Sequence, residues 1–79
     1  MKITAKDVRV ALEAIEIESG IPAPARSCIS QAINSIYQGH LRSADDALDL
    51  AMSRLQDRGV LQRVRRARAR LSKVIASQM

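Results

Sequence analysis

Apolar residues recur every three or four positions along most of this chain, the spacing that gathers side chains on one face of an α-helix. Glycine and proline interrupt the pattern at three places: residues 20–24, residue 39 and residue 59. Both residue types end helices, glycine by adopting a left-handed backbone and proline by blocking continuation. The sequence therefore predicts four helices, over about residues 5–19, 24–38, 44–58 and 60–77.

The first two predicted helices have clear signals at their ends. Thr4 followed by Asp7 has the form of a capping box, in which each side chain accepts a hydrogen bond from the other residue's backbone N–H. Gly20 ends the first helix, Pro24 suits the first turn of the second, and Gly39 ends that helix. The predicted apolar stripe of the second helix consists of Ala25, Ile29, Ala32, Ile33, Ile36 and Tyr37.

The third helix is predicted to begin at Ser43, whose hydroxyl can accept a hydrogen bond from the first helical turn. Three aspartates would then lie near the positive end of the helix dipole, and two arginines near its negative end. The aspartates are Asp45, Asp46 and Asp49, and the arginines are Arg54 and Arg58.

Whether Gly59 separates two helices or lies inside a long one follows from the direction of the apolar stripe. At about 100° per residue, the stripes of residues 44–55 and 60–74 would point roughly half a turn apart on a continuous helix. One straight helix could not bury both stripes against one core. We therefore predict a corner at Gly59, with a single long helix shared across a dimer as the alternative.

Composition favours an all-α bundle of four short helices that forms one domain over residues 1–79. The chain is 47% apolar but has no Phe, no Trp and one tyrosine, so its core must be aliphatic. A domain of this size buries only about 60% of its unfolded surface, so dimerisation would add stability. Val10, Ile17 and Leu50 lie outside the main stripes of their helices. They predict either contacts with a second neighbouring helix or a homodimer interface.

The residue types that carry catalysis are sparse. The only histidine, His40, lies about 18 Å along a helix from the only cysteine, Cys28, so the two cannot act as a pair. Neither a glycine-rich phosphate loop nor a zinc-ligand pair is present. We therefore expect no enzyme activity, no metal and no cofactor. With one cysteine, no secretion signal and no apolar run of roughly 20 residues, a cytoplasmic protein without a membrane partner is expected.

Charge is distributed very unevenly along the chain. Residues 58–79 carry seven Arg and Lys side chains and no Asp or Glu, whereas residues 1–57 carry eight acids and six bases. A surface of one sign attracts the opposite charge, and a merely solvated helix face usually alternates in sign. The asymmetry indicates nucleic acid or an acidic protein surface as the partner, and a solvated face is the third interpretation.

The basic segment also has a regular apolar stripe, which predicts a folded helix and not a disordered tail. Four cations recur at spacings of three, four and three on the side opposite the stripe, and a fifth, Arg65, flanks them. These four form the predicted basic ridge: Arg63, Arg66, Arg70 and Lys73. Arg68 lies nearer the apolar stripe, and we expect it to pair with an acid on another helix.

If nucleic acid is the partner, the lack of aromatic residues argues against stacking on a single strand and favours a duplex. The second helix carries Arg26, Gln31 and Asn34 on its polar side. Amide groups of this kind can read base edges while basic side chains contact phosphates. These three residues are therefore predicted to join the basic ridge in nucleic-acid binding.

Together the patterns predict a small nucleic-acid-binding regulator or accessory protein of bacterial or phage type, acting as a homodimer. The alternative is a non-enzymatic adaptor or inhibitor that docks on a larger complex, itself one that could handle nucleic acid. Such a protein would use the surplus apolar side chains of Val10, Ile17 and Leu50 beside the basic ridge.

Overall fold

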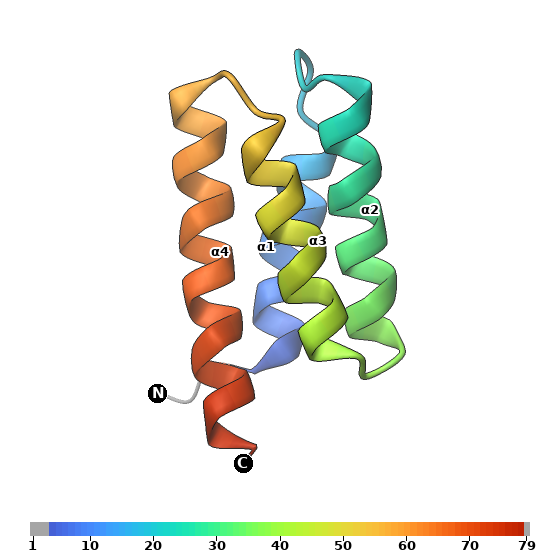
Figure 1. The fold of residues 1–79 in the computed structure, drawn as a ribbon, viewed down its shortest axis with the longest axis vertical. Coiled ribbons are helices and arrows are strands. Elements are labelled where there is room, and N and C mark those ends of the chain that lie inside the picture. The colour runs from blue at the N-terminus through green and yellow to red at the C-terminus, as the bar shows by residue number, and fades with distance from the viewer. Residues whose placement is uncertain (1–3, 79) are drawn as a thin grey trace.

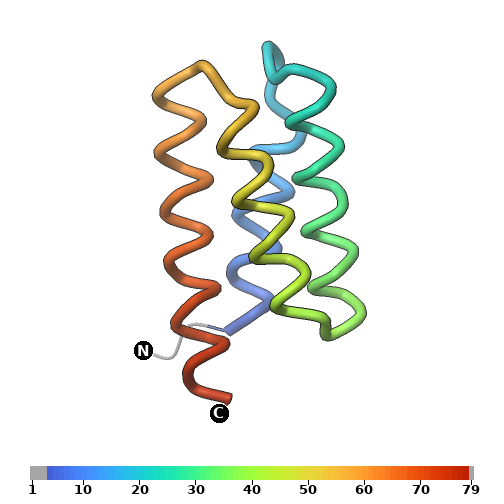
Figure 2. The backbone as a smooth tube through the Cα atoms, in the orientation of Figure 1, coloured from blue at the N-terminus to red at the C-terminus, as the bar shows by residue number. Residues whose placement is uncertain are grey.

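The computed structural model describes residues 4–78 and contains four α-helices that run alternately up and down (Figure 1). They are α1 (Ala5–Glu16), α2 (Ala23–Tyr37), α3 (Leu41–Ser53) and α4 (Arg58–Ser77). Each helix packs against two others, in the cyclic order α1, α2, α3, α4. The backbone path in Figure 2 places α2 and α4 on opposite sides of the bundle. The predicted all-α bundle of four short helices is confirmed.

The core is aliphatic, as predicted. The largest fully buried side chains are Leu12, Ile29, Leu48, Leu71, Val8 and Val64. Alanines on α2 and α3 fill the spaces between them, which lets the helix axes approach closely. Among residues 4–78 no polar or charged side chain is buried, so the core carries no desolvation cost from polar groups.

α1 begins with the predicted capping box. The Thr4 N–H donates to Asp7 Oδ2 at 3.0 Å, and the Asp7 N–H donates to Thr4 Oγ1 at 3.4 Å. The hydrogen bond from the Thr4 backbone, followed by that from its hydroxyl, lowers the pKa of the Asp7 carboxyl below its ordinary value. The ionised form of Asp7 is therefore the form that the capping box favours.

α1 ends at Glu16, three residues before the predicted end at residue 19. The chain leaves the helix early because Ile21 must turn inward and is buried. Gly20 has a φ of +87°, the left-handed conformation that was predicted for it. The carbonyl of Glu18, which no longer bonds within a helix, accepts a hydrogen bond from Arg26 Nη2 at 2.8 Å.

Both ends of α2 lie within one residue of the prediction, and Pro24 lies in its first turn. Gly39 follows the helix with a φ of +80°. The Gly39 N–H donates to the Ile36 carbonyl at 3.0 Å, and the His40 N–H donates to the Ser35 carbonyl at 2.8 Å. These two bonds form a Schellman motif, which requires the left-handed backbone that glycine supplies.

The assignment of Tyr37 to the buried stripe of α2 is wrong. Its side chain is 64% exposed. The Arg9 guanidinium lies 4.4 Å from the centre of the tyrosine ring and also donates a hydrogen bond to its hydroxyl. Arg9 forms an ion pair with Glu13 at 3.0 Å as well, so Tyr37 helps to join α2 to α1 at the surface. Cys28, which was not assigned to the stripe, is buried in the core.

The predicted ends of α3 are wrong on both sides. The helix runs from Leu41 to Ser53, and its N-cap residue is His40, whose side chain makes no capping bond. Ser43 therefore does not cap the helix. The earlier start follows from Leu41, whose burial in the core draws the chain into the helix three residues before the predicted first residue, Ala44.

The earlier start of α3 also overturns the predicted role of its aspartates. No acidic residue lies in the first turn, so an interaction of Asp45, Asp46 and Asp49 with the positive end of the helix dipole is wrong. At the other end, Arg54 is the C-cap residue of α3, whereas Arg58 belongs to the next helix.

The break between α3 and α4 is confirmed, but its predicted position at Gly59 is wrong. The chain turns at residues 54–57, and Gly59 lies in the first turn of α4. Asp57 is the N-cap residue, and its Oδ1 accepts a hydrogen bond from the Val60 N–H at 3.1 Å. The capping residue of α4 is therefore Asp57, three residues before Val60. One long helix through Gly59, the alternative, is also wrong.

Candidate functional site

α4 presents most of its charge to solvent because its apolar stripe faces the core. Six of the seven cationic side chains in residues 58–73 are exposed, and the seventh, Arg68, is half-buried. The basic segment is thus a folded helix, as predicted. Its buried residues are Val60, Val64, Ala67, Leu71 and Val74.

Arg63, a member of the predicted basic ridge, is paired with Glu18. Two nitrogens of its guanidinium donate to the two carboxylate oxygens of Glu18, and the bond from Nη2 measures 2.6 Å. This hydrogen bonding raises the pKa of Arg63 above its already high ordinary value. The pair joins the beginning of α4 to the segment that follows α1. Arg63 is therefore less available to an external anion than an unpaired arginine.

Arg68 pairs with acids on another helix, as predicted. Its Nε donates to Asp45 Oδ1 and its Nη1 donates to Asp49 Oδ1, both at 3.0 Å. The hydrogen bond that Arg68 donates to the Asp45 carboxylate is the main cause that raises the pKa of Arg68. The Arg68 side chain is 33% exposed and that of Asp45 is 24% exposed, so this pair is only partly screened by water. Arg68 therefore joins α4 to α3.

The other five cations of α4 are exposed, and none forms a hydrogen bond or ion pair with another residue of the described chain. The charge of Arg70 contributes weakly to lowering the pKa of Asp7. Four of the five were predicted to bind nucleic acid, and Arg58 was not, because it was assigned to α3. We call them the free cations of α4: Arg58, Arg65, Arg66, Arg70 and Lys73.

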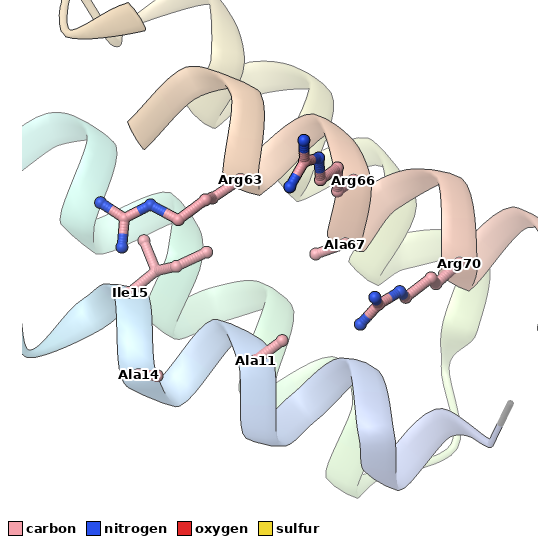
Figure 3. Close-up of a pocket in the computed structure, with 7 residues that line it drawn as sticks. All are labelled: Ala11, Ala14, Ile15, Arg63, Arg66, Ala67 and Arg70. Carbon is pink, nitrogen blue, oxygen red and sulfur yellow. The ribbon is translucent and has the colours of Figure 1, made fainter. Parts of the chain in front are cut away.

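A groove with a volume of about 280 Å³ runs between α1 and α4 beside the free cations. Figure 3 shows the guanidinium groups along its α4 edge and the small side chains of its floor. The edge is formed by Arg63, Arg66 and Arg70, and the floor by Ala11, Ala14, Ile15 and Ala67. The groove thus combines an apolar floor with a positively charged edge.

The residues predicted to read bases are not brought to this site. Arg26, Gln31 and Asn34 are exposed on α2, which packs against α1 and α3. α2 and α4 lie on opposite sides of the bundle, as Figure 1 shows. The buried face of each helix points inward, so their exposed faces point in opposite directions. A straight duplex that contacts the free cations of α4 would therefore not reach Gln31 or Asn34. Arg26 is placed differently, because its guanidinium contacts the carbonyl of Glu18, and the Glu18 carboxylate pairs with Arg63 of α4.

The predicted interface residues lie on two separate surfaces. Val10 is 51% exposed and Ile17 is 83% exposed, and both belong to the α1 segment beside the groove. Leu50 is 47% exposed on α3. It lines a different groove, with Gln31 of α2 among the neighbouring residues. One contact surface therefore does not cover all three apolar side chains.

The remaining reactive residues lie apart from the groove. Cys28 is buried in α2, and Arg54 Nη1 donates to its Sγ at 3.6 Å. His40 is exposed in the turn between α2 and α3. Within residues 4–78, no three His, Cys, Asp or Glu side chains are grouped so as to hold a metal ion. None of the four helices is long and apolar enough to cross a membrane over that part of the chain.

Comparisons of the chain with models of protein families, with curated proteins and with solved structures find no match. The function is therefore inferred from the geometry and charge of α4 and of the α1–α4 groove.

Proposed function

We propose that this protein is a small, non-enzymatic cytoplasmic regulator or accessory protein that binds duplex nucleic acid through α4. The observation that supports the proposal is the unpaired charge of Arg65, Arg66, Arg70 and Lys73. A cation that already has an internal ion pair must give up part of it to bind a phosphate. These four cations have no such pair to lose. Each can therefore neutralise a phosphate and release its counterions without breaking an internal contact.

The arrangement of the charges favours contact with a phosphate backbone. Arg66 and Lys73 are seven residues apart, which is about 10 Å along the helix axis. The side chains between them can reach neighbouring phosphates on one strand or across a groove. The only tyrosine, Tyr37, ends α2 on the opposite side of the bundle and contacts Arg9. α4 has no aromatic side chain on which the bases of a single strand could stack, so a duplex is favoured as the ligand.

The proposal does not depend on the predicted homodimer. A single copy of α4 carries all four cations, so one protomer suffices for the contact. Dimerisation would place two basic helices on one duplex and would steepen the dependence of binding on salt.

The test is the affinity for a fluorescent 20-base-pair DNA duplex, measured by anisotropy over a series of salt concentrations. The wild-type protein should bind at low salt, and log Kd should rise linearly with log salt. Each phosphate contact contributes about 0.9 to that slope. The triple variant Arg66→Ala/Arg70→Ala/Lys73→Ala should therefore bind more weakly, with a slope reduced by up to about 2.7.

A matched control separates local contact from net charge. Gln31→Glu lowers the net charge by one, as Arg66→Ala does, but on the exposed face of α2, across the bundle from α4. Only Arg66→Ala should lower the slope. Equal weakening by both substitutions would show that overall charge alone attracts the duplex, and no wild-type binding at low salt would end the proposal.

A further inference from the structure

An exposed apolar stripe on the α1 segment, which phosphate binding does not use, adjoins the groove between α1 and α4 at Ala14. Val10, Ala14 and Ile17 recur at spacings of four and three residues, so they form one stripe on the outer face of the α1 segment. Ile17 is the most exposed large apolar side chain of the described residues, at 83%. Val10 is 51% exposed. Exposed apolar side chains gathered beside a groove are typical of a protein-binding surface.

The shape of the groove suits a helix. Its floor consists largely of alanines from both helices, and small side chains let a third helix axis approach to about 8–10 Å. Arg63 and Arg70 mark its length on α4. They are seven residues apart, or about 10 Å along the helix axis, so the groove accommodates about two turns of a helix.

The edge of the groove defines the charge of the occupant. Arg66 and Arg70 line it and have no ion pair within the described chain. A partner that covered them without carboxylates would remove unpaired guanidinium groups from water, which costs free energy. A partner with acidic side chains beside its apolar face would instead form charge-assisted hydrogen bonds with both arginines.

We propose that the α1–α4 groove binds an acidic amphipathic helix of another protein. Large apolar side chains of that helix would pack on Ala11, Ala14 and the exposed stripe of Val10 and Ile17, while its carboxylates pair with Arg66 and Arg70. The proposal goes beyond the binding of nucleic acid, because a phosphate backbone offers no apolar partner for Ile17.

A second copy of this chain fits the groove less well. The acids of the α1 segment are already engaged within the chain, so a symmetric dimer through this face would bring Arg66 and Arg70 no free carboxylate. Asp7 bonds with Thr4, Glu13 with Arg9, Glu16 with Ser30 and Glu18 with Arg63.

The test uses a fluorescein-labelled synthetic peptide of fifteen residues, with leucines at alternating spacings of three and four and with glutamates beside them. The wild-type protein should bind it saturably, with a Kd below about 100 µM. A peptide with glutamine in place of each glutamate should bind more weakly. Arg66→Ala/Arg70→Ala should weaken binding of the glutamate peptide and leave the glutamine peptide unchanged.

Apolar variants locate the binding to the groove. Ile17→Ser should raise the Kd for the glutamate peptide about tenfold, because burial of the isoleucine side chain is lost. Leu50→Ser is the matched control, since Leu50 is also exposed but lies on α3 away from the groove, and it should change Kd by less than about twofold. Both positions are exposed, so thermal melts should show both variants folded.

Parallel measurements with the DNA duplex keep this proposal separate from the proposed function. Lys73 does not line the groove, so Lys73→Ala should weaken binding of the duplex and leave binding of the peptide unchanged. Ile17→Ser should weaken binding of the peptide and leave binding of the duplex unchanged. Absence of saturable peptide binding, or equal losses from Ile17→Ser and Leu50→Ser, would overturn the inference. So would loss of duplex binding in Ile17→Ser, which would assign the groove to nucleic acid. Self-association in sedimentation that Ile17→Ser abolishes would assign it to a second copy.

Discussion

Replacing Gly59 with alanine distinguishes a glycine inside a helix from a glycine that makes a corner. A corner glycine has a left-handed backbone, and alanine there lowers the free energy of unfolding. In this structure Gly59 lies in the first turn of α4 and does not have a positive φ. Alanine is favoured over glycine at a helical position, so the substitution should increase the free energy of unfolding.

The size of the gain depends on one contact. Alanine in place of helical glycine contributes about 0.5–1 kcal/mol. The new Cβ would lie 3.2 Å from Asp57 Oδ1, the atom that accepts the capping bond from Val60. The exposed carboxylate must shift by a few tenths of an ångström. This shift weakens the capping bond, which stabilises the helix by about 1 kcal/mol. We expect a net increase of about 0.5 kcal/mol, or a rise in Tm of about 2–4 °C.

Thermal and urea denaturation followed by circular dichroism would measure this effect, with the other two glycines as controls. Gly20 and Gly39 have φ values of +87° and +80°, and no atom lies within 4 Å of a Cβ added at either. Alanine at these positions should therefore act through backbone strain alone. Each substitution should lower the free energy of unfolding by about 1 kcal/mol, the opposite sign to Gly59→Ala.

Repeating the substitution in an Asp57→Ala variant isolates the effect of the contact with Asp57. In Asp57→Ala the crowded carboxylate is absent, so Gly59→Ala should give its full gain of about 1 kcal/mol relative to that background. A loss in both backgrounds, similar to that of the control glycines, would refute the assignment of Gly59 to the first turn of α4.

Three further predictions concern the core, the ion pairs and the capping box. Leu71→Ala should lower the free energy of unfolding by about 3 kcal/mol in urea titrations, whereas Leu50→Ala, at an exposed position, should lower it by less than about 1 kcal/mol. Arg68→Ala removes the ion pairs that join α4 to Asp45 and Asp49, and we expect a loss of about 1 kcal/mol in the free energy of unfolding that shrinks when the titration is repeated in 1 M salt. Because the folded state lowers the pKa of Asp7 below its ordinary 3.8, its contribution is present above that value and lost as the pH falls through the folded pKa. Asp7→Asn should therefore have a lower Tm than wild type near neutral pH and approach it at pH values well below 3.8.

The number, order and core faces of the helices could be predicted from the sequence because each of those features is local. Buried residues such as Ile29 and Ile33 recur at helical spacing, and the reversal of the apolar stripe near residue 59 shows that two helices meet there. The exact ends were harder to predict where tertiary burial competes with capping propensity. At α3, burial of Leu41 outweighs the capping preference of Ser43, and no local pattern measures that competition.

The composition of the candidate site could be predicted only in part, because the availability of a charge depends on partners distant in sequence. Arg68 lies near the apolar stripe, which indicated that it would meet an acid on a neighbouring helix. The partner of Arg63 is 45 residues away, in the segment after α1, and the early end of α1 that places Glu18 there was not predicted. Arg58 was overlooked for a related reason, since it was assigned to the wrong helix.

The two paired arginines also explain why the free cations of α4 point away from the bundle. Arg63 holds one flank of α4 to Glu18 beside α1, and Arg68 holds the other flank to Asp45 on α3. Together with the buried stripe, these pairs restrict the rotation of α4 about its own axis. The cations between the two flanks, including Arg66 and Lys73, must then face solvent or the mouth of the α1–α4 groove. The ion pairs that reduce the number of available charges therefore act together with the buried stripe in orienting the remaining charges toward a ligand.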